Sequence, residues 1–116
     1  MFDEIFTTFY KKNPGIMVMG VWGKDGLVLE NSFFPGKPVI DLDFAGAELA
    51  YVLSRLDKIK IQPQKYYIKI ALGDDILLVY SLTPDFFLVM LADKSIIFGK
   101  LNFYFDIFRE KIIAIL

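Results

Sequence analysis

Three apolar runs separated by turn-forming residues occupy the second half of the chain. The runs cover residues 65–72, 75–82 and 85–92 and are rich in Ile, Val, Leu, Tyr and Phe, which suit a pleated strand. Residues 73–74 (Gly-Asp) and 83–84 (Thr-Pro) separate them, and both pairs favour tight turns. The pattern predicts a meander of three strands.

The first and last of these runs differ in how polar residues are spaced. Polar and apolar positions alternate along 65–72, so this strand should have one dry face and one wetter face. The run 86–92 is apolar at every position, so both its faces should be covered. We therefore expect 65–72 at a sheet edge and 86–92 in the middle. Lysines on an edge discourage unwanted strand pairing, although a deliberate pairing with a second copy is equally compatible with them.

The first third of the chain predicts one helix and a hairpin. Residues 2–12 place apolar side chains at helical spacing, and residues 16–22 form another wholly apolar run that suits a central strand. A turn at 24–26, with Gly where positive φ is needed, leads into a strand over 27–33. The Pro-rich segment 34–38 should be a stiff loop.

Residues 41–58 predict a helix with two distinct faces. Phe44 and Tyr51 lie seven residues apart, nearly opposite the apolar face that should cover the sheet. An ordinary surface helix does not need two aromatic side chains on its outer side, so this face suggests a partner. The sheet-facing positions are Leu42, Ala45, Leu49, Val52, Leu53 and Leu56, and the outer aromatics are bordered by Ala47, Glu48, Arg55 and Lys58.

A final helix should begin at or near Ser95 and run to residue 116. Its apolar positions follow a 4-3-4-3 spacing that is typical of a buried stripe. This stripe consists of Leu101, Phe105, Phe108, Ile112 and Ile115, with Asn102, Asp106, Arg109 and Glu110 expected outside. The predicted order is helix, two strands, helix, three strands, helix, an α/β (α+β) domain spanning residues 1–116.

Composition narrows the possible functions. Hydrophobic residues make up 55% of the 116 positions, which is high for a small chain and suggests an oligomer or a permanent partner. The net charge of −1 argues against nucleic-acid binding, because no basic surplus exists to neutralise phosphates. The chain has no Cys and no His, so it lacks disulfides, thiolate metal sites and the commonest general base.

Targeting signals are not evident in the sequence. The N-terminus carries acidic residues and lacks the basic-then-apolar layout of a secretory signal. The longest weakly charged stretch, 76–92, is interrupted by Pro84 and is shorter than the roughly 20 apolar residues of a membrane span. We therefore expect a cytoplasmic protein that does not insert into a membrane.

No pattern predicts a catalytic, cofactor or metal site. Gly99 and Lys100 do not form a phosphate-binding loop, because the required earlier Gly and following Ser or Thr are absent. The acidic pairs at 74–75 and 41/43 could hold a hard cation, but a turn and a helix cap explain them more simply. A small-ligand pocket lined by aromatic side chains stays open as an alternative, and core packing accounts for most of these residues more economically.

The order of these pieces is similar to that of a known family. The relevant segments are 14–16 (Pro-Gly-Ile), the hairpin 20–29, the Ala-rich helix 44–56, and the runs 70–79, 88–92 and 98–101. Together they resemble the Roadblock family of dynein light chains and MglB-type bacterial polarity regulators, over nearly the whole chain. The Pro-rich loop 35–38 and the aromatic content of the last helix depart from the usual pattern and leave the subfamily open.

This resemblance implies a profilin-like fold and a homodimer. The fold would be a five-stranded antiparallel sheet, with the middle helix on one face and the terminal helices on the other. Such domains usually dimerise by pairing the strand equivalent to 65–72 with its copy, which brings the middle helices side by side. The implied dimer interface comprises Ala47, Lys65, Tyr66, Tyr67, Ile68, Lys69 and Ile70.

The resemblance also implies a regulatory function without catalysis. Relatives act on small Ras-like GTPases, either promoting hydrolysis by reshaping the switch loops or serving as scaffolds, and the family has no catalytic residue to carry over. We expect a non-enzymatic regulator that needs no cofactor, with Phe44, Glu48, Tyr51 and Arg55 as the recognition surface. The alternative is a small-molecule sensor, since PAS and GAF domains of similar shape hold ligands in their cores.

Overall fold

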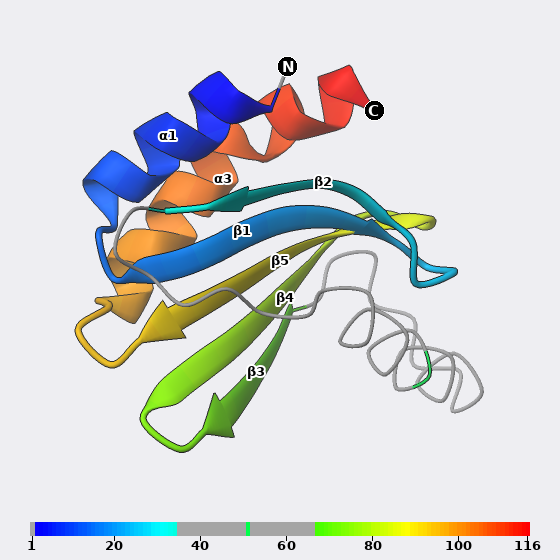
Figure 1. Cartoon of the computed structure of the whole chain (residues 1–116). Helices are drawn as coiled ribbons and strands as arrows, with labels where there is room; N and C mark the ends of the chain where they lie inside the picture. Colours follow the sequence, from blue (N-terminus) through cyan, green and yellow to red (C-terminus); the bar gives the residue numbers. More distant parts are fainter. Residues whose placement is uncertain (1, 35–50, 52–66) are drawn as a thin grey trace.

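The computed structural model describes residues 2–34, 51 and 67–116, which form two helices and five strands (Figure 1). The helices are α1 (Asp3–Lys12) and α3 (Phe98–Ile115). The strands are β1 (Ile16–Gly23), β2 (Val28–Phe33), β3 (Tyr67–Leu72), β4 (Asp75–Thr83) and β5 (Phe86–Asp93).

The strands form one antiparallel sheet in the order β2-β1-β5-β4-β3. Strand β5 occupies the centre and β3 an edge, so both positions predicted from the polar pattern are confirmed. Strand β1 lies next to β5, as its apolar sequence indicated. The β1–β2 turn has Gly26 at φ +89°, a value that only Gly adopts readily, which confirms the turn chemistry.

Helices α1 and α3 both cover one face of the sheet (Figure 1). Alternate residues of the three inner strands point toward these helices and are fully or nearly fully buried. Aromatic rings link these elements. The Tyr80 ring of β4 lies 4.3 Å from the Phe105 ring of α3, and the Phe9 ring of α1 lies 6.0 Å from the Phe108 ring of α3. The core on this side includes Phe6, Phe9, Ile16, Met19, Val21, Leu78, Leu88, Met90, Leu101 and Ile112.

The opposite face of the sheet holds a second buried cluster. Trp22, Val79, Phe87 and Val89 form it, with Ile68 of β3 packed at its margin. Gly20 allows the indole to lie flat along β1, because a Cβ at this position would be 2.6 Å from Trp22 Nε1. Both faces of the inner strands are therefore buried.

The turn between β4 and β5 lies one residue from its predicted position, and α3 begins about three residues after its predicted start. The turn between β4 and β5 consists of residues 84–85, because Thr83 stays in the strand and its Oγ1 accepts a hydrogen bond from the Asp85 N–H at 3.3 Å. Helix α3 begins at Phe98 and not near Ser95, because the Ser95 N–H donates to Asp93 Oδ1 at 2.9 Å and holds residue 95 in a local turn.

The outer surface of α3 also differs from its prediction. The buried stripe is confirmed, with Leu101, Phe105 and Ile112 buried and the other two members half-buried. Arg109, expected outside, turns inward and donates from Nη2 to the Leu82 carbonyl oxygen at 2.8 Å. This hydrogen bond satisfies a carbonyl near the end of β4, which explains why a charged side chain is drawn from the surface.

Several predicted elements lie outside the described residues. They are the loop 34–38 beyond Phe34, most of the helix 41–58 and the segment 59–64. Within this range only Tyr51 is described, and its backbone is helical.

Truncation in the central strand tests this account of the core. Leu88→Ala should lower the free energy of unfolding by about 2–5 kcal/mol, because Leu88 is fully buried and the substitution leaves a cavity. Leu27→Ala is the matched control, since Leu27 is 71% exposed and should change stability by less than about 0.5 kcal/mol. Urea unfolding followed by circular dichroism measures both, and equal effects would contradict this description of the core.

Candidate protein-interaction surface

Strand β3 forms one edge of the sheet, and four of the predicted dimer-interface residues lie on it. Tyr67, Ile68, Lys69 and Ile70 belong to this strand, which pairs with β4 on its inner side and with no described strand on its outer side. The other three, Ala47, Lys65 and Tyr66, lie outside the described residues. The described part of the predicted interface is thus a continuous edge.

The register with β4 shows which backbone groups of β3 point outward. Antiparallel strands alternate between hydrogen-bonded and non-hydrogen-bonded pairs, and a two-residue turn closes on a hydrogen-bonded pair, here Leu72 with Asp75. Counting back, Ile70 and Ile68 bond to β4, while Ala71, Lys69 and Tyr67 fall in the other kind of pair. The N–H and C=O groups of these last three residues therefore face the open edge.

The side chains of β3 alternate between the two faces of the sheet. Ile68 and Ile70 are half-buried, and Ile68 packs on the Trp22 side of the sheet, whereas Lys69 and Ala71 are exposed. This pattern confirms the dry and wetter faces predicted from the sequence. It also leaves the outer edge bordered by apolar side chains on one face only.

The side chain of Lys69 lies over the Phe98 ring. Its Nζ lies 4.5 Å from the centre of the Phe98 ring at the start of α3, close enough for a cation–π contact. The contact draws the positive charge away from the strand edge and reduces the repulsion that a lysine there would exert on a second strand. No sequence pattern indicated this contact, because the two residues are far apart in the chain and meet only when α3 covers the sheet.

The hairpin turn after β3 joins this strand to β4. Gly73 has φ +64°, which L-residues with a Cβ adopt only at a cost, and no atom lies within 4 Å of the position that a Cβ would take. An exposed ion pair, Lys94 Nζ to Asp74 Oδ1 at 3.9 Å, joins this turn to the end of β5. Such an exposed pair contributes little to stability, whereas the positive φ of Gly73 suits the two-residue turn.

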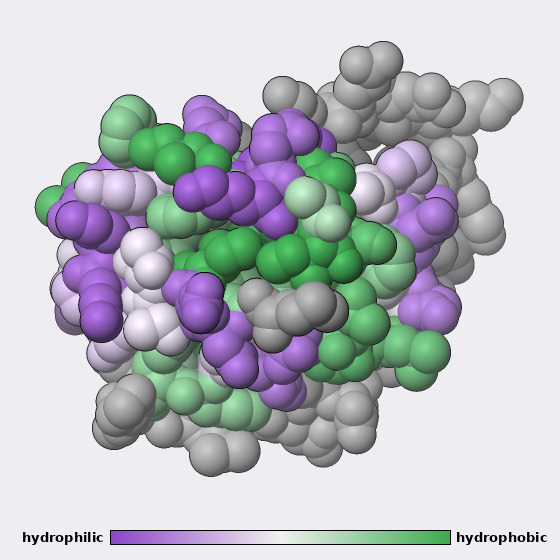
Figure 2. All heavy atoms as spheres, turned by 90° about the horizontal axis from the view of Figure 1, so that it is seen from above, coloured by the Kyte–Doolittle hydropathy of each residue, from purple (hydrophilic) through white to green (hydrophobic). Residues whose placement is uncertain are grey.

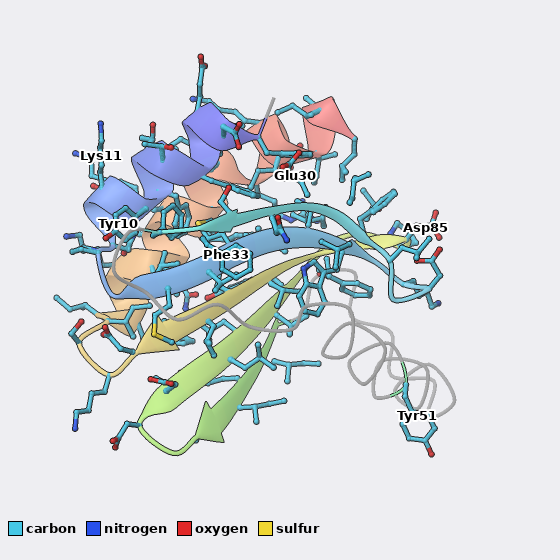
Figure 3. The ribbon with its side chains drawn as sticks, in the orientation of Figure 1. Tyr10, Lys11, Glu30, Phe33, Tyr51 and Asp85 are labelled. Atoms are coloured by element: carbon cyan, nitrogen blue, oxygen red, sulfur yellow. The ribbon has the colours of Figure 1, made fainter. Side chains whose placement is uncertain are left out.

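Tyr51 is the one described member of the predicted recognition surface. It is 58% exposed and helical, and Figure 3 shows its side chain on the side of the sheet opposite α1 and α3, pointing away from the sheet. Phe44, Glu48 and Arg55 lie outside the described residues. An aromatic side chain this exposed is a common anchor at protein interfaces.

Across residues 2–34, 51 and 67–116, no three acidic side chains are grouped so as to hold a metal ion. Asp74, considered as a cation ligand from sequence, instead lies in the hairpin turn beside Lys94. In the same part of the chain, neither helix is both long and apolar enough to cross a bilayer.

Comparison with solved structures identifies the fold. The chain matches MglC from Myxococcus xanthus over 99% of its length and 98% of that chain, with a TM-score of 0.70 at 21% identity. It matches the gliding protein MglB from Thermus thermophilus over 97% of its length and 86% of that chain, with a TM-score of 0.78 at 18% identity. A Roadblock/LC7 domain from Streptomyces avermitilis matches over 91% and 89%, with a TM-score of 0.71 at 16% identity. The chain has the Roadblock fold.

The similarity to Roadblock proteins is found by comparing structures and not by the two sequence-based comparisons. No protein-family model matches the chain, and a search of the curated proteins finds no match. The Roadblock fold expected from the order of motifs is confirmed, together with its five-stranded antiparallel sheet and the terminal helices on a shared face.

Adding a side chain at Gly73 tests the turn that positions β3 in this Roadblock fold. Gly73→Ala should destabilise the protein by about 1 kcal/mol, because Ala adopts positive φ at a cost. Gly99→Ala is the matched control: it lies in α3 with open space around it, and Ala should stabilise the helix by up to about 1 kcal/mol. Thermal unfolding of both variants measures the difference, and a stabilised Gly73→Ala protein would contradict the strained turn.

Proposed function

We propose that this chain forms a homodimer that binds a small Ras-like GTPase and has no catalytic residues of its own. The observation that carries the proposal is the structural match to MglB and MglC over nearly the whole chain. The Roadblock family implied by the sequence resemblance works through GTPases. Acceleration of GTP hydrolysis and simple localisation of the partner are two forms of this role, and an assay of phosphate release distinguishes them.

The outer edge of β3, which pairs with no described strand, supports strand pairing as the route to the dimer. Unpaired N–H and C=O groups in a row form a template for another strand. The two edges of the sheet differ in this respect. Strand β2 is interrupted by a bulge opposite residues 21–22 and carries Glu30, Asn31 and Ser32 at its centre, whereas β3 keeps an unbroken register with β4 from residue 67 to residue 72. A continuous sheet through two copies is therefore favoured at β3.

The core of the described chain favours a protein-binding role over the ligand-sensor alternative. A sensor of PAS or GAF type needs an internal space for its ligand. On the helical face, Phe2, Phe6 and Phe9 are fully or nearly fully buried, and the rings of Phe2 and Phe6 stack at 5.7 Å. Core packing thus accounts for the aromatic side chains that suggested a pocket, and no observation specifically favours a bound small molecule.

A proline at the outward-facing position of β3 tests the dimer. Lys69→Pro removes the N–H that points away from β4, so it should block pairing with a second copy and leave the internal ladder intact. We expect light scattering to give a dimer, twice the chain mass of 13.3 kDa, for the wild type and a monomer for Lys69→Pro at micromolar concentration.

Lys69→Ser is the control for this experiment. It loses the same contact with Phe98 but keeps the backbone N–H, so it should remain dimeric. Circular dichroism confirms that both variants fold. A wild-type monomer, or a Lys69→Pro dimer as tight as the wild type, would show that β3 does not form the interface.

Loss of the exposed aromatic tests the recognition surface. Tyr51→Ala should weaken binding to a Ras-like GTPase by about tenfold or more, because exposed aromatics are favoured anchors at interfaces. Calorimetry against a panel of purified Ras-like GTPases, each loaded with GDP or with a non-hydrolysable GTP analogue, measures the affinity. Release of phosphate from GTP, with and without the chain, shows whether hydrolysis is accelerated.

Leu27→Ala provides the comparison for Tyr51→Ala. Leu27 is also an exposed large apolar residue, but it lies in the turn between β1 and β2 and is not a member of the predicted surface, so binding should be unchanged. Equal affinities for Tyr51→Ala and the wild type would place the surface elsewhere. If no member of the panel binds the wild type, the GTPase proposal fails as a whole.

A further inference from the structure

Helix α3 exposes two large apolar side chains on its outer side. Phe103 is 60% exposed and Ile107 is 46% exposed, one turn further along the helix. Both lie nearly opposite the stripe that packs on the sheet, so they take no part in the buried core. The Phe103 ring meets only the edge of Tyr104, its neighbour in the helix, among the ring contacts of the described residues.

The outer side of the neighbouring helix α1 differs from that of α3. The exposed positions of α1 are all polar, and they are Asp3, Glu4, Thr7, Thr8, Lys11 and Lys12. Figure 2 looks down on the helical face and shows hydrophobic side chains gathered on it among hydrophilic ones. A helix that faces only solvent needs polar residues on its outer side, and α1 has Thr and Lys there. Phe and Ile at the centre of the outer side of α3 therefore suggest a contact.

The outer residues of α3 follow the spacing of a helix-pairing surface. Positions 100, 103, 107, 110 and 114 recur at intervals of three and four residues, the repeat that lets two helices pack along a seam. Lys100, Phe103, Ile107, Glu110 and Ala114 occupy them, and all five are exposed. We call this set the α3 outer seam. The buried stripe of the same helix has the same kind of spacing, so α3 carries a second seam without a described partner.

The charges of the α3 outer seam are complementary to those of the same seam on a second, antiparallel copy of the helix. When two copies of α3 run antiparallel with residue 105 of each at the centre, position 100 meets position 110, and position 103 meets position 107. Lys100 then faces Glu110 of the second copy twice, and Phe103 faces Ile107 of the second copy twice. A parallel pair would place Lys100 against Lys100 and Glu110 against Glu110, which is unfavourable.

Glu110 already has one ionic contact, and this contact does not prevent the pairing. Its Oε1 lies 3.2 Å from Nη1 of Arg109, whose guanidinium is anchored on the Leu82 carbonyl oxygen. The Glu110 side chain is nevertheless exposed, so its second carboxylate oxygen can accept from a lysine. The anchored arginine also restricts the carboxylate, which lowers the entropy lost when a partner binds.

We infer that the α3 outer seam binds the same seam of a second copy of this chain, in antiparallel orientation. This contact is separate from the β3 edge, because it uses the outer side of the helical layer and leaves the sheet edge open. A contact between two single helices is smaller than the roughly 1,200 Å² buried in stable interfaces, so the association should be weak and concentration-dependent. Together with strand pairing it would join dimers into larger assemblies.

Concentration-dependent mass is the first test. Sedimentation velocity from micromolar to several hundred micromolar should show the wild-type average mass rising with concentration, and it should show Lys69→Pro rising from monomer toward dimer. The double variant Phe103→Ser/Ile107→Ser should lower the association constant by about tenfold or more, because it removes the apolar centre of the seam. The Lys69→Pro background separates helix pairing from strand pairing, so failure of one leaves the other measurable.

A charge-swap experiment tests the antiparallel register. Lys100→Glu places Glu at both charged positions, Glu110→Lys places Lys at both, and each variant alone should associate less than the wild type. An equimolar mixture of the two should regain association, because every Glu then faces a Lys. Lys12→Glu makes the same charge change on α1 and should leave association unchanged.

The outcomes separate clearly. Loss of association in the single variants with recovery in the mixture supports the inference. A wild-type mass that does not change with concentration would overturn it, as would undiminished association of the Phe103→Ser/Ile107→Ser variant. The double variant Lys100→Glu/Glu110→Lys carries both charge changes, so each Glu at 100 would face a Lys at 110 of an identical copy. Wild-type association of this variant supports the register, and weakened association would rule it out. Thermal unfolding shows that each variant remains folded.

Discussion

Strand β5 is covered on both of its faces, and the other elements are arranged around this requirement. Leu88 and Met90 point toward α1 and α3, while Phe87 and Val89 point into the Trp22 cluster on the other side. A strand with no polar face can be satisfied only at the centre of a sheet that is covered on both sides. β1 and β4, which are largely buried, flank it, and β2 and β3, which have no fully buried side chain among those described, lie at the edges. The position of β3 at the edge of the sheet is thus a consequence of what β5 must bury.

Much of this arrangement could be predicted from the sequence, because it depends on side-chain polarity at regular spacing. The uniformly apolar run at 86–92 indicated the centre of the sheet, and the alternation along 65–72 indicated its edge. The order of turns and runs was sufficient to suggest the Roadblock fold, which the structural matches confirm. The assignment of Tyr51 to a recognition surface is still a prediction, although its exposure is compatible with that role.

The features that the sequence did not predict depend on particular hydrogen bonds and on strand register, which residue spacing does not reveal. Ser95 suits a helix start, yet its hydrogen bond to Asp93 delays α3 by three residues. Arg109 suits an outer surface, yet the Leu82 carbonyl oxygen binds it. With Arg109 turned inward, the exposed α3 outer seam is more apolar than the helical pattern indicated. The direction of the β3 backbone groups needed the register with β4, which periodicity alone does not provide.

The two-residue turn at 73–74 determines which alternate residues of β3 present their N–H and C=O groups at the outer edge of the sheet. With this turn length, the residues with outward N–H groups are Tyr67, Lys69 and Ala71. One extra residue in the turn, unless a bulge absorbed it, would exchange the two sets and carry the lysine to the Trp22 side of the sheet. The length of this exposed turn therefore helps to set which residues of β3 face outward, although its side chains make few contacts. An insertion in such a turn can change which groups a strand edge presents, with every original residue still present.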